Sequence, residues 1–429
     1  MTSFPPFGTD GIRGVYGKTI TPFFSYALGK AIFKLGNIKR LAIGMDNRQS
    51  GPPLMLTLAQ GFGEKVENYG PLTTPAFSSI LRKGNYDLGI MITASHNGPE
   101  YNGFKLLNPD GSKIDVKLEK QISSLLEIET NPSGPIHLKE KDFFDIYRAG
   151  FVSFKTKGKY VFDLASGASQ FVVPGICALL GIDATYIGLG EGKTINQGCG
   201  CLHMENLAKA MATGNYDLGF SFDGDGDRVL AMDKEGHILD GDDFLYLFAL
   251  SFKQNHRLKG NAVVSTIYSN SFLKEALKEE GIDCFEADVG DHSVYLKLKE
   301  NDFLLGGENS GHIIVMDELP SGDGLANALR LIDIYENKSA VFEKFKALSH
   351  TPRSERDVYF VDANKAKEAY ESISFAKAIK EGQAKIEGKG KLVTRLSGTE
   401  PLIRVFVESQ DKVKNDTIVS DIVSSLKES

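Results

Sequence analysis

Short apolar runs alternate with longer amphipathic segments along most of this 429-residue chain. Leu41–Met45, Tyr160–Phe162 and Ala262–Ile267 are such runs, and each is followed by a stretch whose apolar residues recur at helical spacing. Runs of this length are typical of buried strands, and helices between them favour parallel pairing. The pattern therefore predicts an α/β protein with mixed, largely parallel sheets.

The string GNYDLG occurs twice, at Gly84–Gly89 and at Gly214–Gly219. Each copy leads through a short apolar strand into a polar loop, and Asp302–His312 (DFLLGGENSGH) is a weaker third copy. Aligned on their aspartates, the copies make three loop residues equivalent: Ser95, Asp225 and Ser310. The repeat predicts three related domains, each with a loop at the carboxyl end of an equivalent strand, where open α/β sheets bind ligands.

Breaks in the pattern divide the chain into four predicted domains: residues 1–150, 151–242, 243–352 and 353–429. A segment rich in Pro, Gly and charge, Glu129–Lys141, precedes an amphipathic stretch, Phe143–Phe154, at the first boundary. The last part carries no copy of the repeat, so we expect a smaller α+β domain there. Several domains agree with the length, because one core rarely serves more than about 300 residues.

The charge balance argues against nucleic acid as a partner. Lys and Arg number 49 against 56 Asp and Glu, a net charge of −7, so the basic excess that neutralises phosphates is absent. No apolar stretch approaches the roughly 20 residues that span a bilayer, and the first residues lack the features of a secretory signal. Four cysteines without a CxxC pair fit a reducing compartment, so we expect a cytoplasmic protein with no membrane partner.

Asp223, Asp225 and Asp227 alternate with glycines directly after an apolar strand. In an extended chain the period of two turns all three carboxylates to one side, where repulsion of roughly 4 kcal/mol per pair favours a bound cation. A calcium loop is excluded because Arg228 and Lys234 stand where it needs Gly and Glu. Mg²⁺, which takes few protein carboxylates, is the predicted ion, and the alternative is an Asp/Gly-rich surface turn.

Ser95, in the sequence TASHN, is the counterpart of this loop in the first copy. It does not lie in a G-x-S-x-G elbow, and an extended chain would point His96 to the opposite side, so a hydrolase triad is not predicted. A lone serine is more often a turn or capping residue. Beside a metal loop, however, a serine phosphate would complete the coordination of the ion.

Alternate positions also hold Cys199, Cys201 and His203, which could present soft ligands to zinc. A fourth ligand is not evident nearby. We therefore favour the alternative, in which these cysteines are small buried apolar residues.

Two loops at opposite ends of the chain offer donors for an anion. FGTDGIRG contributes a glycine-rich loop with Arg13. RLSGTEPLIR contributes side chains and backbone amides that could surround a phosphate: Arg395, Ser397, Gly398, Thr399 and Arg404. Each loop alone could be a turn with a surface arginine, but together they favour a phosphorylated small-molecule ligand.

Six motifs, in order from end to end, resemble those of the α-D-phosphohexomutase family: FGTDGIRG (Phe7–Gly14), TASHN (Thr93–Asn97), NGFK (Asn102–Lys105), DGDGDR (Asp223–Arg228), GGENSGH (Gly306–His312) and RLSGTEP (Arg395–Pro401). The resemblance implies an isomerase-class phosphotransferase. It also implies three related α/β domains and a smaller C-terminal α+β domain around a central cleft that collects one loop from each.

The resemblance further implies a role for each matching residue. Ser95 would be the phosphoserine, and one Mg²⁺ per active site would be held by Ser95, Asp223, Asp225 and Asp227. The groups around the transferring phosphoryl would be Arg13, His96, Lys105 and Arg228. Sugar contacts would come from His292, Glu308 and Ser310, and contacts to the other phosphate from Arg395, Ser397, Gly398, Thr399 and Arg404. The proton would be moved by Lys105, His292 or His312.

Within the family, GTDGIRG, INQGCG (Ile195–Gly200) and GGENSGHII resemble the branch that acts on hexosamine phosphates. This implies conversion of glucosamine 6-phosphate to glucosamine 1-phosphate, for amino-sugar nucleotide synthesis, by a monomer or homodimer with a sugar 1,6-bisphosphate as intermediate and activator. Two departures are Gly98 before Pro99, and His292 where that branch carries Arg or Lys. The alternatives are a family member acting on mannose and glucose phosphates and a non-catalytic sugar-phosphate binding protein.

Overall fold

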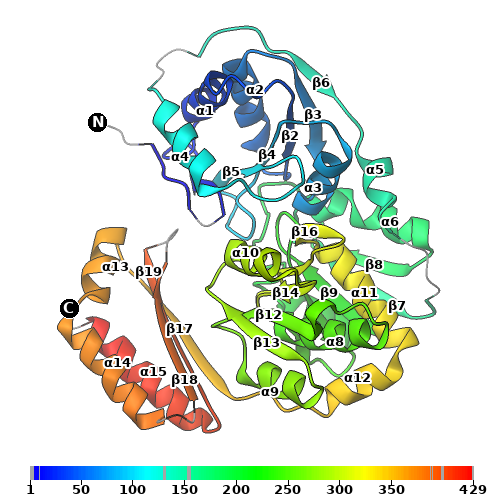
Figure 1. Ribbon diagram of the computed structural model, residues 1–429, viewed down its shortest axis with the longest axis vertical. Helices are drawn as coiled ribbons and strands as arrows, with labels where there is room; N and C mark the ends of the chain where they lie inside the picture. Colours follow the sequence, from blue (N-terminus) through cyan, green and yellow to red (C-terminus); the bar gives the residue numbers. More distant parts are fainter. Residues whose placement is uncertain are drawn as a thin grey trace. The chain divides into compact units, whose positions relative to one another are not determined.

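The computed structural model describes residues 4–8, 10–128, 132–151, 156–386, 388, 390–397 and 401–427. The chain forms two compact units, one of residues 1–266 and 280–346 and one of residues 267–279 and 347–429. Three sheets of the described chain belong to the first unit and one to the second (Figure 1). Within the described residues, no helix is both long and apolar enough to cross a membrane.

The first sheet has six strands in the spatial order β1-β5-β4-β2-β3-β6. Its strands are β1 (Ile12–Val15), β2 (Leu41–Met45), β3 (Val66–Pro71), β4 (Leu88–Ile92), β5 (Tyr101–Leu107) and β6 (Leu138–Glu140). The accompanying helices are α1 (Pro22–Lys34), α2 (Gly51–Phe62), α3 (Thr74–Lys83), α4 (Val116–Leu125) and α5 (Phe144–Arg148). β2 pairs in parallel with β3 and β4, whereas β5 runs antiparallel to both β4 and β1.

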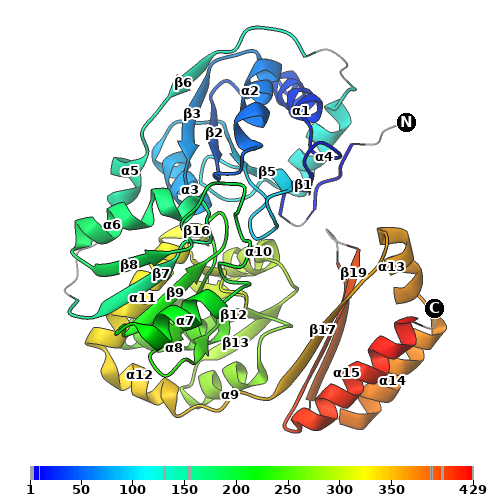
Figure 2. The same cartoon turned by 180° about the vertical axis from the view of Figure 1, so that it is seen from behind.

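The second and third sheets share one topology, β11-β10-β9-β7-β8 and β13-β12-β14-β15-β16. The second contains β7 (Lys159–Asp163), β8 (Asp183–Ile187), β9 (Leu218–Phe222), β10 (Val229–Asp233) and β11 (Ile238–Leu239), with helices α6 (Val173–Leu180) and α7 (Glu205–Thr213). The third contains β12 (Ala262–Thr266), β13 (Asp283–Ala287), β14 (Leu305–Gly307), β15 (Ile313–Val315) and β16 (Leu319–Gly322). Four more helices accompany these sheets (Figure 2): α8 (Gly241–Gln254), α10 (Asp291–Asn301), α11 (Gly324–Asn337) and α12 (Ser339–Lys346).

The structure confirms that the three sheets are related. In each sheet, one strand has a parallel neighbour on either side. One of these two neighbours pairs, on its other side, with an antiparallel strand. Ser95, Asp225 and Ser310 are each the third residue after the end of the equivalent strand, β4, β9 or β14. The repeated aspartates also act alike in the first two copies, because Asp87 accepts a bond from Arg40 N and Asp217 accepts one from Lys159 N, both at 2.9 Å.

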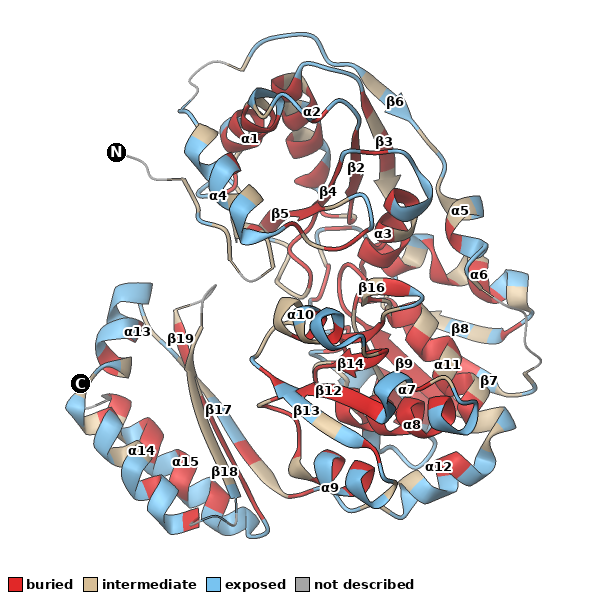
Figure 3. Ribbon diagram, in the orientation of Figure 1, coloured by how far each residue is buried: buried red, intermediate tan, exposed pale blue. Residues whose placement is uncertain are grey.

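Apolar burial explains why the strands form. All five residues of β2, β4 and β9 are buried, as expected for strands covered on both faces (Figure 3). In the second sheet, Phe162 of β7 stacks on Phe220 and Phe222 of β9, with ring centroids 5.2 and 6.4 Å apart. In the predicted amphipathic stretch Phe143–Phe154, the described residues form the short helix α5, and residues 152–154 lie outside the described chain.

The second unit has a three-stranded antiparallel sheet in the order β17-β19-β18. Its elements are α9 (Ser271–Glu279), β17 (Arg353–Tyr359), α13 (Ala363–Tyr370), α14 (Ile373–Ile386), β18 (Gly390–Leu396), β19 (Leu402–Ser409) and α15 (Lys412–Lys427). Buried Ile403, Val405 and Val407 of β19 pack with Ile418 and Ile422 of α15. This arrangement agrees with the predicted small α+β domain.

A half-buried aspartate, Asp323, joins α5 to α11 in the first unit. Asp323 caps α11 by accepting a bond from Ala326 N at 3.0 Å, and the hydroxyl of Tyr147 donates to both carboxyl oxygens at 2.9 and 3.0 Å. Burial raises the pKa of Asp323 from 3.8 to about 6. The ionised form is therefore disfavoured in the folded chain relative to the unfolded chain.

We predict that Asp323→Asn stabilises the chain, relative to wild type, more at pH 7.5 than at pH 4.5. Because the folded pKa lies above the unfolded value, the folded state binds this proton more tightly, and the contribution of Asp323 to the unfolding free energy falls as pH rises through 6. The stability difference should grow by about 2 kcal/mol over this range in urea unfolding. Asp288→Asn, at an exposed position, is the control, and a difference independent of pH would contradict the prediction.

Candidate active site

Ser95 lies at the end of the first sheet, beside the aspartate loop of the second. It is fully buried, and its Oγ donates a hydrogen bond of 2.6 Å to Oδ2 of Asp223. Its backbone has a φ of +49°, in the left-handed region that non-glycine residues seldom occupy. A serine held in this conformation, against a carboxylate 128 positions away, is typical of a functional site rather than of a simple turn.

Arg48, which the sequence analysis did not select, holds the Ser95 loop in place. Its guanidinium is fully buried and pairs with Asp46 through Nε at 2.9 Å. It also donates to backbone carbonyls of the loop, those of Ser95 (3.0 Å), Asn97 (2.8 Å), Gly98 and Tyr101 (3.0 Å). Its position after β2, another parallel strand of the sheet, is the signal that could have identified it.

The expected position of His96 is wrong. We expected its ring on the opposite side from Ser95, but Nδ1 of His96 lies 3.4 Å from Ser95 Oγ. The expectation assumed an extended chain, whereas the left-handed conformation of Ser95 turns both side chains to the same side. Burial, together with the neighbouring cations Arg228 and Arg13, lowers the pKa of His96 well below its ordinary value, so its ring is neutral.

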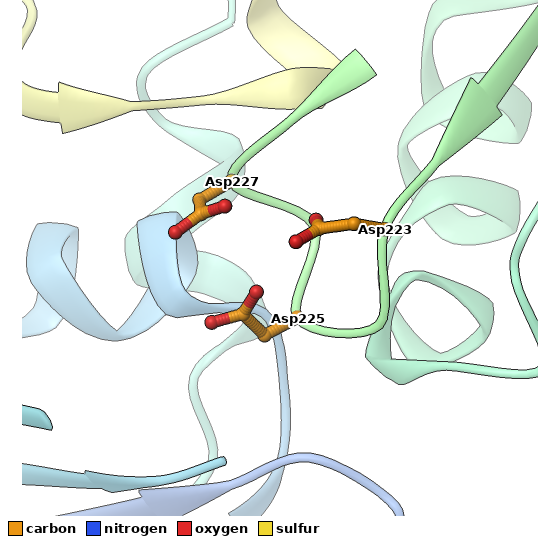
Figure 4. A group of neighbouring side chains, drawn as sticks. All are labelled: Asp223, Asp225 and Asp227. Carbon is orange, nitrogen blue, oxygen red and sulfur yellow. The ribbon is translucent and has the colours of Figure 1, made fainter. Parts of the chain in front are cut away.

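Asp223, Asp225 and Asp227 are buried and converge on one space, as Figure 4 shows. One carboxylate oxygen from each lies within 4.8 Å of the others. The strand-like alternation that we assumed is not what brings them together, because the loop is a turn in which Gly226 has a φ of +73° and donates its N–H to Asp223 Oδ1 at 3.0 Å. The predicted convergence is therefore correct, but its geometric reason is different.

The environment of each carboxylate differs. Burial and repulsion from Asp227 and Asp225 raise the pKa of Asp223 well above its ordinary value. Burial opposes ionisation of Asp225 and Asp227 too, but Lys105 outweighs it and holds both pKa values below the usual range. Lys105 Nζ lies 2.8 Å from Asp225 and 2.7 Å from Asp227.

The three aspartates could hold a metal ion. Asp225 Oδ1 and Asp227 Oδ1 are buried without a hydrogen-bond partner among the described residues. Buried carboxylate oxygens left in this way fit an oxygen-preferring divalent cation. Over the described ranges, no other group of three or more His, Cys, Asp or Glu side chains is arranged to bind a metal.

The zinc alternative finds no support in this geometry. Cys199 and Cys201 are buried, whereas His203 is exposed, so the three do not face one point. Burial raises the pKa of both thiols, which keeps them protonated and makes them poor metal ligands. They behave as the small buried residues that we favoured.

The predicted cations surround the carboxylates. Arg13, on β1, is nearly buried and pairs with Asp10. Burial alone would lower the pKa of Arg228, but Asp227 and Asp223 outweigh burial and raise it. Burial likewise opposes the charge on Lys105, and Asp225 and Asp227 hold its pKa above the ordinary value. Lys105 and Arg228 therefore remain positive close to the serine and the aspartates, whereas burial lowers the pKa of Arg13.

A second ion-pair network, which the sequence did not reveal, links the first sheet to the third. Lys113 pairs with both Asp10 and Asp291, the first residue of α10. Asp10 also lies 3.2 Å from Lys105 Nζ. His312 Nε2 accepts the N–H of Gly322 at 3.2 Å and lies 3.8 Å from Asp291 and 4.0 Å from Asp227.

Of the predicted sugar-contacting residues, Glu308 and Ser310 lie in the loop after β14, and His292 lies in the first turn of α10. Glu308 is buried and accepts the N–H of Gly290 at 3.0 Å, which ties its loop to the start of α10. Ser310 Oγ is buried without a hydrogen-bond partner among the described residues. His292 lies beside Lys113 and Asp291 at the wall of a small cavity of about 10 Å³, and burial lowers its pKa.

The predicted phosphate-binding loop belongs to the second unit. Arg395 of β18 is the register partner of Arg404 on β19. Arg404 is already paired, with Asp357 through two bonds of 2.7 Å and with Glu355 at 3.1 Å. Ser397 follows β18 and donates its N–H to Leu402 O at 2.9 Å, whereas Gly398 and Thr399 lie outside the described residues.

Comparison with known proteins gives consistent matches over the whole chain. Family models described as Phosphoglucomutase/phosphomannomutase match residues 5–133 (alpha/beta/alpha domain I), 240–350 (alpha/beta/alpha domain III) and 354–425 (C-terminal domain). The phosphoglucosamine mutase of Bradyrhizobium diazoefficiens is 35% identical over 444 residues, covering 98% of each chain. That of Carboxydothermus hydrogenoformans is 35% identical over 442 residues, covering 98% of this chain and 99% of the relative.

Solved structures show the same fold. A phosphoglucomutase/phosphomannomutase family protein from Burkholderia thailandensis superposes with a TM-score of 0.78 at 24% identity, covering 98% of this chain and 97% of that one. The N-acetylphosphoglucosamine mutase of Aspergillus fumigatus, in complex with glucose 1,6-bisphosphate, gives 0.70 at 17% identity, covering 100% and 95%. The fold and the full-length relatives define an isomerase-class phosphotransferase. The chain belongs to the α-D-phosphohexomutase family.

We predict that Lys113→Met lowers the unfolding free energy by about 2–3 kcal/mol. The substitution removes the cation from Asp291 and Asp10, and the side chains of Lys113 and Asp291 are only 18% and 15% exposed, so the effect is just below that of a fully buried pair. Adding Asp291→Asn should recover at least half of the loss, as measured by urea unfolding of the single and double variants. Lys117→Met, at an exposed position on α4, is the control, and no recovery in the double variant would contradict the network.

Proposed function

We propose that this chain interconverts glucosamine 6-phosphate and glucosamine 1-phosphate through a phosphorylated Ser95 and a glucosamine 1,6-bisphosphate intermediate. The observation that carries the proposal is the hydrogen bond between Ser95 Oγ and Asp223, inside a buried aspartate cluster surrounded by Lys105, Arg13 and Arg228. Full-length relatives named phosphoglucosamine mutase support the choice of sugar.

The residues present fit Mg²⁺, and Ser95, Asp223, Asp225 and Asp227 would hold one ion. Two of these carboxylates each offer a buried oxygen without a hydrogen-bond partner among the described residues. When bound, the ion would supply positive charge that stabilises the transferring phosphoryl group. The proposed ligands follow strands of two different sheets. The complete ligand set therefore exists only while the Ser95 loop stays in contact with the aspartate turn.

In the proposed reaction, a free hydroxyl of the bound sugar phosphate attacks the phosphorus on Ser95. The bond between phosphorus and Ser95 Oγ breaks and a bond to the sugar oxygen forms. The hydroxyl proton of the sugar passes to a base, and Ser95 Oγ takes up a proton to become the free hydroxyl. Arg13, Lys105 and Arg228 stabilise the charge that spreads over the phosphoryl oxygens. Arg13 and Lys105 are already held in ion pairs, so they need little reorganisation. The reverse transfer returns the other phosphoryl group of the bisphosphate to Ser95.

We propose that His312 offers a proton from Nδ1 rather than taking one. Its Nε2 accepts the N–H of Gly322, so the neutral ring carries its hydrogen on Nδ1, which is buried without a partner in the part of the chain that the structure describes. Lys105, a further candidate, is held as a cation by Asp225 and Asp227 and so serves as a positive charge rather than a base. His292 lines the small cavity, and Glu308 accepts a hydrogen bond from Gly290, two residues before His292. We therefore propose that His292 contacts the sugar.

The proposal is tested by measuring phosphoryl transfer and sugar preference together. Wild-type chain incubated with a sugar 1,6-bisphosphate should gain the mass of one phosphoryl group, and Ser95→Ala should gain none. With Mg²⁺, kcat/KM should be higher for glucosamine phosphate than for glucose or mannose phosphates, and chelation should abolish turnover reversibly. A higher kcat/KM for mannose or glucose phosphate would contradict the assignment of glucosamine phosphate as substrate. Binding of sugar phosphate without any phosphorylation of Ser95 would identify a non-catalytic protein.

We further propose that Arg395 binds the phosphate that is not reacting, while Arg404, already paired with Asp357, orients the β18–β19 hairpin. Arg395→Ala should raise KM at least tenfold, because a charge-assisted bond to the phosphate is lost. It should leave Ser95 open to phosphorylation, as intact mass shows. Arg356→Ala, on the exposed part of β17, is the control, and an unchanged KM in Arg395→Ala would contradict the assignment.

A further inference from the structure

The segment Ile195–Gly200 (INQGCG) belongs to the second sheet's domain but reaches the Ser95 loop of the first. Asn196 Nδ2 donates to the carbonyl of Ser95 at 2.8 Å and to that of Asn97 at 2.9 Å. The side chain is buried, and the backbone N–H of Asn196 donates to Ala165 O at 2.9 Å. One amide group therefore connects two domains at the proposed phosphorylation site.

The same two carbonyls also accept bonds from Arg48 on the other side of the loop, at 3.0 Å for Ser95 and 2.8 Å for Asn97. A carbonyl oxygen has two lone pairs, so Arg48 and Asn196 together use the full capacity of both carbonyls. Arg48 comes from the end of β2, in the same domain as Ser95. Asn196 thus donates to the backbone of the loop from the domain of the aspartates, beside the bond between the Ser95 side chain and Asp223.

The aspartate loop contacts this junction directly. A Cβ added at Gly224 would lie 2.5 Å from the carbonyl oxygen of Ser95 and 2.7 Å from Asn196 Nδ2. Cys201, just beyond the segment, donates its N–H to Phe222 O, the residue before Asp223, at 2.9 Å. The Ser95 loop, the aspartate turn and Asn196 therefore meet at a position where only glycine fits.

We propose that Asn196 is a positioning residue that sets the distance between Ser95 and the aspartate cluster by holding the Ser95 and Asn97 carbonyls. The inference rests on the proposed function for its kinetic consequence. Without the amide, the loop stays attached to Arg48, but its backbone carbonyls lose their bonds to the second domain, and the contact of the Ser95 side chain with Asp223 remains. Ser95 Oγ is then less well fixed at 2.6 Å from Asp223, and misplacement of a reacting atom by about 1 Å lowers a rate by about 100-fold.

The backbone of Asn196 determines the choice of variant. Its φ is +59°, a left-handed conformation that alanine would strain and glycine adopts freely. Asn196→Gly therefore removes the amide without backbone strain. Asn196→Asp tolerates the same conformation but offers carboxylate oxygens, which cannot donate to carbonyls.

We expect Asn196→Gly and Asn196→Asp to lower kcat by about 10- to 100-fold, with KM within threefold of wild type. Hydrogen exchange of the backbone amides of residues 94–101 should become faster in both variants. The matched control is Asn206→Ala on α7, which removes an amide that donates to Gly198 O at 2.6 Å from the other side of the same segment. It should change neither kcat nor exchange in the Ser95 loop.

A kcat within twofold of wild type for Asn196→Gly, together with unchanged exchange of residues 94–101, would overturn the inference. Equal loss of kcat in Asn206→Ala would also overturn it, because any loosening of the segment would then suffice. The exchange measurement does not depend on turnover. If the wild-type chain itself transferred no phosphoryl group, the proposed function would fail while exchange would still decide the role of Asn196.

Discussion

Three carboxylates buried within a few ångströms of one another are the constraint on which the site depends. Such a cluster is unfavourable unless positive charge is brought to it, because burial and mutual repulsion both oppose ionisation. The chain meets this demand with Lys105 from β5, Arg13 from β1 and Arg228 from the aspartate loop itself. The same positive charge suits a phosphoryl group, so the residues that stabilise the folded cluster also prepare it for phosphoryl transfer.

The repeated sheet topology explains how distant residues reach this cluster. Each of the three sheets ends an equivalent strand with a loop, and Ser95, Asp225 and Ser310 lie three positions beyond β4, β9 and β14. One loop presents a serine, the second presents aspartates, and the third contributes Glu308, Ser310 and His312. Side-chain bonds then join loop to loop, as in Ser95 with Asp223, and Thr74 with Asp225 at 2.6 Å. A fold of related units thus supplies different chemical groups from one structural position.

The sequence was sufficient to predict the α/β class, the three related units, and the meeting of Ser95 with the aspartates, because these follow from short repeated strings and strand ends. It did not identify Arg48, Lys113 or Asp291. Their importance arises from burial and from partners on other elements, and neither leaves a local pattern. The error over His96 has a similar origin, since a left-handed φ at Ser95 depends on the contacts around the loop.

The most direct test of the account is the position of a divalent ion in crystals of the chain grown with Mn²⁺, which favours the same oxygen ligands and scatters anomalously. The account predicts a single strong anomalous peak in the site, about 2.1 Å from an oxygen of Ser95 or its phosphate and from one oxygen of each of Asp223, Asp225 and Asp227. A peak bound elsewhere, with the aspartates and Ser95 sharing no ion, would contradict it.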